Sequence, residues 1–582
     1  MLETDGNGVE GRRGRWGRLD EAVMEDSGRI DVRLGRRGFL TAAAAAVAAP
    51  TIQAAALGHG DVLARARSAR RRGRLAEHKG TPDCVRLYYE AAVFAYAALA
   101  ADPGSAGATA VYNDGLAGCL RAACRHRLID PRSQLLVPGP GGATAVPIVH
   151  QGFVWSPADF HGLLDPATAP RNLSNRHDHS RGGLGATQVV VRRNLHQDSC
   201  DGFLHDAMYF PATAVLRPDL DSWLGGGGPG GDVLELYDPL RVGAVALPGG
   251  VAPLASDVDA PMSFLAWSTS DGESGWAGLL NPSQDVNRAF LGLLEPFQPG
   301  KIPVFFVHGM FDSPYTFSDL MNGLRLKPGF LDRYQIAGYR YATGMTFLHS
   351  AAQFRERLRA FEAAFDPWRS DPGVQDSVFV GHSLGGLLIK LQLVSSGEAF
   401  WNLVSNRPLE TLAATEQTRA SLASLFHFDP VPFARRAVFM ATPHGGLTTF
   451  GKTGETLNEV VNRPPRDLDP LIAEVAAANP GAILPYMREL PSGVSVLRGR
   501  DPIHQALHDL PIAAYVRYHT VAGTGRVTPS AVGFSDGVVP VASAVLEGAE
   551  SQTLIPEWHT TMNYSEYALA EVDRILKAHL AG

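Results

Sequence analysis

The amino-acid sequence predicts an α/β protein whose C-terminal half is a mainly parallel sheet flanked by helices. From about Lys301 onward, short continuous apolar runs alternate with longer amphipathic segments. This alternation is typical of a parallel sheet that is buried on both faces. The N-terminal half differs, because a helical stretch is followed there by short β-type runs between Gly, Pro and Asp turns.

Length and composition limit the classes of protein that fit. A chain of 582 residues is too long for one ordinary hydrophobic core, so two or more domains are expected. Hydrophobic residues make up 45% and charged residues 19%, with a mean hydropathy of -0.04, which is typical of a globular protein. The formal net charge of -7 gives no reason to expect nucleic acid as a partner.

Residues 1–56 carry the pattern of an export signal. Arg36 and Arg37 precede a weakly apolar, Ala-rich run from Thr41 to Ala49, and small residues follow at 54–56. This order resembles a twin-arginine signal cleaved near Ala56, although no Ser or Thr precedes the arginines and Thr41 stands where Lys is common. We therefore expect export to the periplasm or beyond the cell. The alternatives are an Ala-rich helix of the mature protein or, for the arginine-rich first eighty residues, a basic arm for RNA or an anionic membrane.

Two further segments precede the C-terminal half. Residues 57–134 are predicted to be helical, with an antiparallel pair over 84–101 and 110–127 that turns at Pro103-Gly104. Residues 135–299 are predicted to form a β-rich accessory region whose last strands pair with the C-terminal sheet. Its clearest β-type runs are 188–191, 213–216 and 233–237. No membrane-spanning segment is expected in the chain.

The four cysteines all lie in the N-terminal half, at Cys84, Cys119, Cys124 and Cys200. Their spacing matches no zinc-binding pattern. Cys119 and Cys124 are expected on different faces of one helix, which makes a disulfide between them doubtful.

Residues 300–582 are predicted to form the sheet domain. Strands are expected over 302–307, 334–341, 377–380, 436–441, 515–522 and 552–558. Helices are expected over 315–326, 350–365, 384–394 and from 564 onward. Insertions after the third helix, at 396–434, and after the fourth strand, at 447–513, are long enough to form a lid.

Ser383 is the candidate nucleophile. It lies in Gly381-His382-Ser383-Leu384-Gly385, between an apolar strand pattern and the start of a helix pattern. A strand, a sharp turn and a helix expose a serine in this way, and flanking glycines relieve the strain of the turn. A second G-x-S-x-G at 533–537 contains Ser535, but no helix pattern follows it, so Ser535 is expected in a loop.

A serine nucleophile that attacks a carbonyl group needs donors for the oxyanion that forms. The segment His308-Gly309-Met310 directly follows the strand over 302–307. The backbone N–H groups of Met310 and Leu384 are the candidate donors, each worth about 3 kcal/mol of transition-state stabilisation. The alternative for this segment is an ordinary turn from strand to loop.

Asp536 and His559 are the candidate acid and base. Asp536 lies in a loop after the strand over 515–522, and His559 follows the last strand. Both positions fit the order Ser, Asp, His, in which the carboxylate holds the imidazole that takes the serine proton. The rival acids are Asp501, Asp509 and Glu557, and the rival bases are His504, His508, His519 and His579.

Four segments of the C-terminal half carry a family resemblance. They are 307–314, 381–387, 441–446 (Ala-Thr-Pro-His-Gly-Gly) and 535–541. In these segments the chain, over roughly residues 300 to 582, is similar to the bacterial lipase- and esterase-like members of the α/β-hydrolase superfamily. The resemblance implies an α/β-hydrolase sheet with Ser383, Asp536 and His559 as catalytic triad and Met310 and Leu384 as oxyanion hole. The chain departs from the usual family residues at Gly446-Leu447 and at Thr560-Thr561. His444 is interpreted as a structural residue near the site.

The resemblance favours hydrolysis of carboxylic esters with apolar acyl chains through an acyl-enzyme on Ser383. No metal ion or organic cofactor is expected. The expected partner is a small-molecule or lipid ester, with transient contact to a membrane surface as a possibility. Aromatic and aliphatic side chains of the first insertion either line an acyl pocket or pack within the insertion itself. The alternatives are an acyltransferase with the same triad and a catalytically silent binding protein with this fold.

Overall fold

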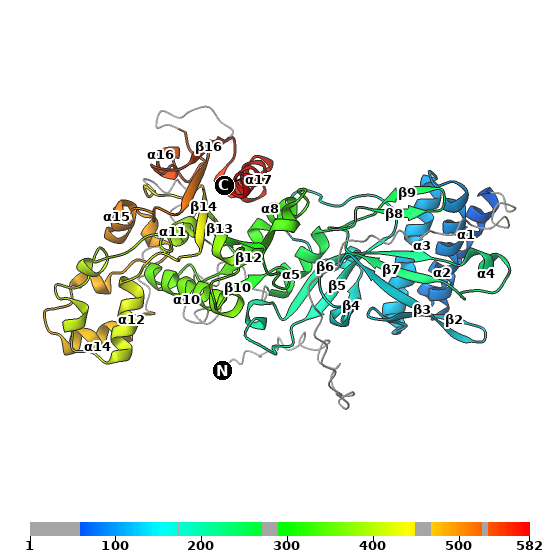
Figure 1. Ribbon diagram of the computed structural model, residues 1–582, viewed down its shortest axis with the longest axis horizontal. Helices are drawn as coiled ribbons and strands as arrows, with labels where there is room; N and C mark the ends of the chain where they lie inside the picture. Colours follow the sequence, from blue (N-terminus) through cyan, green and yellow to red (C-terminus); the bar gives the residue numbers. More distant parts are fainter. Residues whose placement is uncertain are drawn as a thin grey trace, which may run out of the picture. The chain divides into compact units, whose positions relative to one another are not determined.

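The computed structural model describes residues 59–172, 174–269, 289–310, 312–447, 467–525 and 534–581. The export signal predicted for residues 1–56 lies outside these ranges. The described residues form two seven-stranded sheets and one two-stranded sheet, β8 (Ala244–Leu247) with β9 (Gly250–Pro253), together with the helices around them (Figure 1). The mixed α/β class predicted from the sequence is confirmed.

The first sheet is built from residues 129–237. Its strand order is β1-β2-β3-β7-β6-β5-β4. The strands are β1 (Ile129–Asp130), β2 (Gln134–Gly139), β3 (Gly142–Gln151), β4 (Gly162–Leu164), β5 (Ala186–Arg193), β6 (Ala207–Arg217) and β7 (Val233–Tyr237). Most neighbours are antiparallel, while β3 and β7 run parallel.

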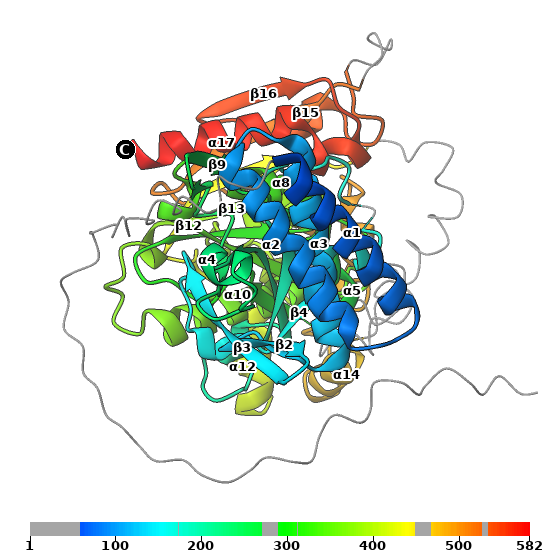
Figure 2. The same cartoon turned by 90° about the vertical axis from the view of Figure 1, so that its right-hand side faces the viewer.

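Three helices pack beside this sheet: α1 (His59–His78), α2 (Asp83–Ala101) and α3 (Ala106–His126). Figure 2 shows them side by side. They approach closely because α1 and α3 each present a glycine to Tyr88 of α2. A Cβ atom on Gly73 would lie 2.9 Å from the Tyr88 ring, and one on Gly118 would lie 2.8 Å from it. All three helices lie in the segment predicted to be helical, 57–134, although only the pair that became α2 and α3 was expected with bounds of its own.

The expectation that no segment could span a membrane needs one correction. By length and composition alone, α2 is apolar enough to cross a bilayer. Most of it is buried in the protein, where it contacts α1, α3 and β2. Its apolar composition is therefore accounted for by its place at the centre of the helical layer.

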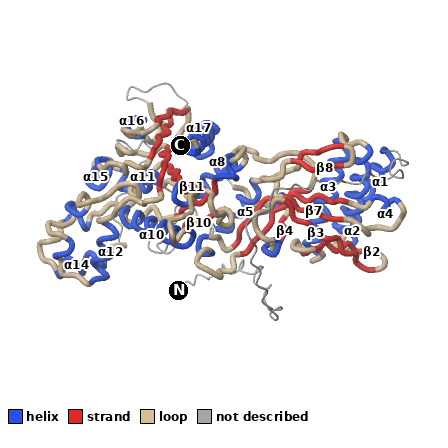
Figure 3. The backbone as a smooth tube through the Cα atoms, viewed as in Figure 1, coloured by secondary structure: helices blue, strands red, loops and turns tan. Residues whose placement is uncertain are grey.

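The second sheet has the order β10-β12-β11-β13-β14-β15-β16, and its strands are red in Figure 3. The strands are β10 (Phe290–Leu293), β11 (Ile302–Val307), β12 (Tyr334–Arg340), β13 (Ser377–His382), β14 (Ala434–Met440), β15 (Arg517–Gly523) and β16 (Ser551–Ile555). All neighbours are parallel except β10, which pairs antiparallel with β12. The expected pairing between the last accessory strand and this sheet is confirmed, and the sheet begins at Phe290.

Both faces of the second sheet are buried. Along β11, Val304 and Phe306 face α8 (Ser318–Arg325) and α17 (Glu566–Leu580). Phe305 and Val307 face the opposite layer, which contains α10 (Phe347–Phe365) and α11 (Leu384–Lys390). This alternation has the period of two that a strand imposes on its side chains. Since the strands from β11 to β16 are parallel, the loops that follow them gather at one edge of the sheet.

The first insertion, 396–434, packs on itself and on α10. It contains η8 (Trp401–Leu403), η9 (Leu409–Thr411) and α12 (Glu416–Phe426). Phe400 stacks on Phe428 at 5.8 Å between ring centroids, and the Arg355 guanidinium lies 3.8 Å from the Phe428 ring. Its buried apolar side chains include Phe400, Trp401, Leu422, Leu425 and Phe426. Two alternatives were expected for these side chains, lining an acyl pocket or packing within the insertion. The structure shows packing within the insertion.

The second insertion is described at Leu447 and from Asp467 onward, and it contains α14 (Asp469–Ala478) and α15 (Pro502–Asp509). It is tied to the start of α10, because Asp467 accepts hydrogen bonds from the Thr346 hydroxyl at 2.9 Å and from His349 Nδ1 at 2.7 Å. Further along, Gly493 N donates to Met345 O at 3.0 Å.

A buried ion cluster joins the accessory residues to the second sheet. Glu295, which follows β10, accepts from Arg241 Nη2 at 3.0 Å and from Arg325 Nη2 of α8 at 3.3 Å. Arg241 also pairs with Asp238. Burial raises the pKa of Glu295, but Arg241 and Arg325 outweigh it and hold this pKa below its usual range. The carboxylate is therefore ionised at neutral pH.

We predict that Glu295→Gln destabilises the fold in a pH-dependent way. At pH 7 it leaves two buried guanidinium groups without their shared anion, at a cost of about 3 kcal/mol. The folded-state pKa lies below the unfolded-state value, so this contribution exists above about pH 4.3 and is lost as the pH falls. Urea unfolding at pH 7 and pH 4 should show the wild-type advantage shrinking at the lower pH.

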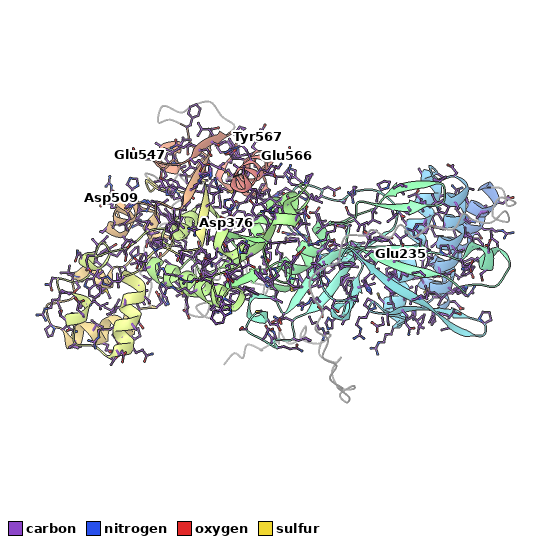
Figure 4. All side chains as sticks on the ribbon, in the orientation of Figure 1. Glu235, Asp376, Asp509, Glu547, Glu566 and Tyr567 are labelled. Carbon is purple, nitrogen blue, oxygen red and sulfur yellow. The ribbon has the colours of Figure 1, made fainter. Side chains whose placement is uncertain are left out.

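Glu235→Gln is the matched control. Glu235, labelled in Figure 4, lies on β7 and pairs with Arg217 in a partly exposed ion pair. Water screens such a pair, so its loss should cost less at pH 7 than the loss of Glu295. Equal destabilisation by Glu295→Gln at both pH values would contradict the interpretation of the cluster.

Candidate active site

Ser383 lies at the turn between β13 and α11. Its backbone has φ 54° and ψ -124°, in the left-handed region that β-carbon-bearing residues avoid. Ser383 N donates to Met440 O of the adjacent strand at 2.9 Å, which anchors the turn to the sheet. The sequence predicted this strand, turn and helix, and the structure has all three.

Close packing around the turn explains the glycines that flank it. A Cβ atom on Gly385 would lie 2.2 Å from Val307 O, and one on Gly386 would lie 1.9 Å from Thr442 Oγ1. A β-carbon at either position would therefore displace β11 or the loop after β14. Glycine at both positions lets α11 begin directly against the carboxyl ends of the neighbouring strands.

The structure brings Ser383, His559 and Asp536 together. His559 Nε2 lies 3.0 Å from Ser383 Oγ, and His559 Nδ1 lies 2.8 Å from Asp536 Oδ2. His559 is the first residue of η12 (His559–Tyr564), and its N–H donates to Asp536 O at 2.9 Å. The second carboxylate oxygen of Asp536 accepts from Val538 N at 2.9 Å and from Val539 N at 2.6 Å.

This arrangement is suited to moving a proton from the hydroxyl group to the imidazole. Asp536 is only 2% exposed and accepts two backbone N–H groups, so its carboxylate is fixed in orientation. With Nδ1–H held by that carboxylate, Nε2 of a neutral His559 presents its lone pair to the hydroxyl of Ser383. The serine itself is 6% exposed, which reduces competition from water.

Leu384 and the segment that carries Met310 both lie next to the nucleophile. Leu384 is the first residue of α11, so its N–H has no acceptor within the helix. Gly309 lies against the nucleophile, since a Cβ atom on it would be 3.1 Å from Ser383 Cβ, and Met310 follows it directly. The second insertion also reaches this point, because a Cβ atom on Gly493 would lie 3.1 Å from Leu384 Cδ2.

The sequence did not identify His382 as a neighbour of His559. The two rings lie 4.7 Å apart, and His382 Nε2 is 3.2 Å from His559 O. Asn563 Nδ2 lies 3.3 Å from His382 Nδ1 and also donates to Thr316 Oγ1 at 3.2 Å. Burial, together with His559, lowers the pKa of His382 well below its usual value, so this ring is neutral. Its position inside the G-x-S-x-G pattern was the only signal in the sequence.

Asp312 adds a second carboxyl group near the site. Burial raises the pKa of Asp312 to about 6, although a hydrogen bond with Thr316 and the nearby His559 act in the opposite direction. Asp312 belongs to the segment 307–314, which carries the family resemblance, but no role for its carboxyl group was predicted from the sequence.

The rival histidines have partners elsewhere. His504 Nε2 and His508 Nδ1 each lie 3.0 Å from His444 O. The other two contact the buried Arg436 of β14: its Nη1 lies 2.6 Å from His519 Nε2, and its Nε donates to His579 Nδ1 at 3.0 Å. Asp376, labelled in Figure 4, pairs with His579 at 3.2 Å. These contacts are structural and do not involve Ser383.

The rival acids are also held in other places. Asp501 caps α15 and accepts from the Tyr486 hydroxyl at 2.7 Å. Glu557 accepts from the hydroxyls of Thr561 at 2.6 Å and Ser565 at 3.1 Å. Asp509, labelled in Figure 4, is the last residue of α15.

Ser535 and His444 lie where the sequence placed them, in loops. The Ser535 hydroxyl donates to Val539 O at 3.1 Å within the loop that carries Asp536. His444 is 1% exposed, and its ring meets Phe439 edge-on at 4.7 Å between centroids. Neither of its ring nitrogens has a hydrogen-bond partner among the described residues.

No group of three or more His, Cys, Asp or Glu side chains is arranged to hold a metal ion in the part of the chain that the structure describes. The four cysteines lie in that part and are free thiols.

No protein-family model and no curated protein sequence matches the chain. Solved structures match about half of it. They include the mature lipase BlEst2 of Bacillus licheniformis, at 16% identity over 49% of this chain and 98% of that one, with a TM-score of 0.30. They also include esterase B of Lactobacillus rhamnosis bound to a tributyrin phosphonate, at 11% identity over 50% and 80%, with a TM-score of 0.27. A third is the bottromycin epimerase BotH, at 13% identity over 50% and 93%, with a TM-score of 0.26. Likenesses this weak carry no conclusion about activity.

The strained backbone at Ser383 predicts that two substitutions of this residue differ in their effect on the stability of the fold. Ser383→Ala keeps the β-carbon in the left-handed region, whereas Ser383→Gly removes it; both lose the hydrogen bond to His559. Relief of the strain, offset by the greater freedom of glycine in the unfolded chain, should make Ser383→Gly more stable than Ser383→Ala by about 1 kcal/mol. Thermal unfolding of the two purified variants checks this, and a more stable Ser383→Ala would contradict it.

Proposed function

We propose that the chain is a serine hydrolase that cleaves carboxylic esters through an acyl-enzyme on Ser383. The observation that carries the proposal is the continuous hydrogen-bond chain from Ser383 Oγ through His559 to Asp536, at 3.0 and 2.8 Å. It begins at a serine whose backbone is held in a strained turn between a strand and a helix. A nucleophile, a base and an orienting acid in this geometry support nucleophilic acyl transfer.

The proposed reaction has two halves. In the first, Ser383 Oγ forms a bond to the ester carbonyl carbon while its proton passes to His559 Nε2. The carbonyl oxygen becomes an oxyanion, which the N–H groups of Met310 and Leu384 stabilise. When the bond to the leaving oxygen breaks, His559 returns the proton to that oxygen, and the alcohol departs.

In the second half, water attacks the acyl-enzyme. His559 takes a proton from the water molecule, and a second tetrahedral intermediate collapses to release the carboxylic acid and regenerate the Ser383 hydroxyl. Asp536 stabilises the imidazolium that forms in both halves. If an alcohol replaces water as acceptor, the same residues transfer the acyl group, so the ratio of acid to new ester separates the two activities.

Apolar esters are the proposed substrates. Three apolar side chains near the triad are exposed to solvent: Trp558 is 37% exposed, Val538 40% and Phe534 46%. Trp558 directly precedes His559, and the other two lie in the loop that carries Asp536. An exposed apolar rim of this kind favours an apolar ester and transient contact with a lipid surface.

With Arg36 and Arg37 in a twin-arginine pattern, we also propose that the protein acts after export.

We predict that a fluorophosphonate labels Ser383 and no other serine. Mass spectrometry of the digested, labelled protein identifies the modified peptide, and a nitrophenyl ester series from acetate to dodecanoate measures the activity. Ser383→Ala should lose both labelling and ester cleavage, because it lacks the nucleophile. Ser370→Ala, at an exposed loop serine, is the matched control and should keep both. Labelling at Ser535 or at any other residue would contradict the assignment of Ser383 as the nucleophile.

Two substitutions distinguish Asp536, the proposed acid, from the buried rival Glu557. Asp536→Asn should lower kcat by about 10³- to 10⁴-fold, because the amide cannot hold His559 in the required tautomer. Glu557→Gln removes a carboxylate that contacts Thr561 and Ser565, so kcat should fall less than tenfold in whatever fraction folds. Steady-state kinetics normalised to folded protein measures both, and the reverse ranking would exclude Asp536 as the acid.

A further inference from the structure

A chain of buried polar side chains lies behind the triad and ends at the backbone of His559. It runs from Thr316 of η6 (Pro314–Phe317) through Asn563 of η12 to His382, the last residue of β13. Asn563 Nδ2 lies 3.2 Å from Thr316 Oγ1 and 3.3 Å from His382 Nδ1. His382 Nε2 in turn lies 3.2 Å from His559 O. Figure 1 labels β13 and the helices α8 and α17, which follow η6 and η12.

The contact with the carbonyl oxygen of His559 determines where His382 carries its proton. A carbonyl oxygen can only accept a hydrogen bond, so the proton is on His382 Nε2. The imidazole is neutral, because burial and the neighbouring His559 lower its pKa well below the usual value. A neutral imidazole has a single N–H group, so His382 Nδ1 is an acceptor and Asn563 donates to it.

Thr316 fixes the same direction from the other end of the chain. Burial raises the pKa of Asp312 to about 6, and a hydrogen bond from the Thr316 hydroxyl opposes this rise. Since its proton points to that carboxyl group, the Thr316 oxygen accepts from Asn563. Both N–H groups of the Asn563 amide are then used, while its Oδ1 has no partner among the described residues. A reversed amide would turn this oxygen toward the lone pair of His382 Nδ1, so the amide orientation is set by its neighbours.

His382 also contacts the other parts of the proposed catalytic site. Ser383 directly follows it in the chain, and its ring centroid lies 4.7 Å from that of His559. A Cβ atom on Gly309 would lie 3.2 Å from His382 Nδ1 and 3.3 Å from His382 O. The segment that carries Met310 therefore packs directly on this residue. A change in the His382 ring would reach groups on both sides of the Ser383 hydroxyl.

The titratable groups around His382 favour a neutral ring. His308, which follows β11, faces it as a neutral imidazole, because burial lowers the pKa of His308 to about 4. From η12 it is faced by His559, whose Nδ1 is already bound to Asp536 at 2.8 Å. Asp312 is linked to it only through Thr316 and Asn563. A charged His382 would place a second positive charge beside the imidazolium that the proposed reaction forms on His559.

We propose that Asn563 and His382 are positioning residues for the base of the reaction. Asn563 holds His382 in the tautomer that carries its proton on Nε2. That N–H group then holds the backbone of His559, so that the imidazole of the base meets Ser383 Oγ. This inference rests on the proposed hydrolase function, which assigns His559 the role of base. Neither side chain is given a contact with the substrate, so their loss should lower kcat and leave KM nearly unchanged.

Two substitutions at position 382 separate the N–H donor from the space that the ring fills. His382→Met is similar in size but has no donor, so kcat should fall about tenfold or more, with KM changed by less than about twofold. His382→Gln carries an amide N–H at a comparable reach and should keep kcat within about threefold of the wild type. Steady-state kinetics with the nitrophenyl ester series, normalised to folded protein, measures both.

His519→Met is the matched control for the loss of a buried histidine. His519 contacts Arg436 of β14 and does not contact the triad. This variant should have a lower Tm than the wild type, but an unchanged kcat in the fraction that folds. Thermal unfolding and the same kinetic assay check the two expectations.

Asn563→Asp tests the other link and covers the case in which His382→Met does not fold. The new side chain has nearly the same shape, but its carboxylate accepts a hydrogen bond where the amide donates one. It should draw a proton to His382 Nδ1 and lower kcat about tenfold or more, because the hold on His559 is weakened or a charge is placed beside it. Ring ¹⁵N NMR reports the tautomer without any turnover. In the Ser383→Ala protein, His382 should be neutral with its proton on Nε2 from pH 8 to pH 5, and a second spectrum with His382→Gln assigns the signal.

Three results would overturn the inference. A proton on His382 Nδ1, or a charged ring, in the Ser383→Ala protein would contradict the tautomer. Equal losses of kcat in His382→Met and His382→Gln would assign the ring a purely structural role. An Asn563→Asp enzyme with the kcat of the wild type would exclude Asn563. In each case a wild type that cleaves esters and is labelled at Ser383 keeps the proposed function, whereas a wild type that does neither refutes that function and the positioning role with it.

Discussion

The left-handed backbone of Ser383 is the constraint on which the geometry of the site depends. It costs free energy by itself, of the order of 1–3 kcal/mol, and persists only because the surrounding packing allows no other path. Ser383 N is bonded to Met440 O, and the helix that follows starts against β11 through Gly385. With the turn fixed at both ends, the hydroxyl points away from the sheet toward the loops after β15 and β16, where the imidazole lies 3.0 Å away.

The imidazole is held by backbone groups as much as by its carboxylate partner. His559 donates its N–H to Asp536 O, and its own carbonyl oxygen lies 3.2 Å from His382 Nε2. Because His382 is buried and neutral, it can act as a donor there without adding a positive charge beside the imidazolium that the proposed reaction creates. The elements that carry His559 and Asp536 are therefore tied to each other and to β13, the strand that directly precedes the nucleophile.

The parts of this site that the sequence predicted are those fixed by local pattern. Apolar runs located the strands, and the glycines around Ser383 marked a turn whose steric demand is local. The roles of His382, Asn563 and Asp312 were missed because they depend on contacts between segments that lie far apart in the chain. The antiparallel pairing of β10 was expected only in outline, since register depends on the partner strand. Helix α1 lies in the segment predicted to be helical, but its bounds were not predicted because its many arginines weaken the apolar periodicity.

The turn η6 (Pro314–Phe317) packs against the triad region on one side and against the cavity lined by His205 and Tyr315 on the other. In a 3₁₀ turn, consecutive side chains diverge by about 120°, since three residues complete one turn. Tyr315 therefore faces the cavity, where it meets His205, while the next residue, Thr316, faces Asn563 beside the triad. Pro314 rests against β12 only because Gly338 has no β-carbon. Contacts on both of its sides therefore fix the position of η6, which begins four residues after Met310.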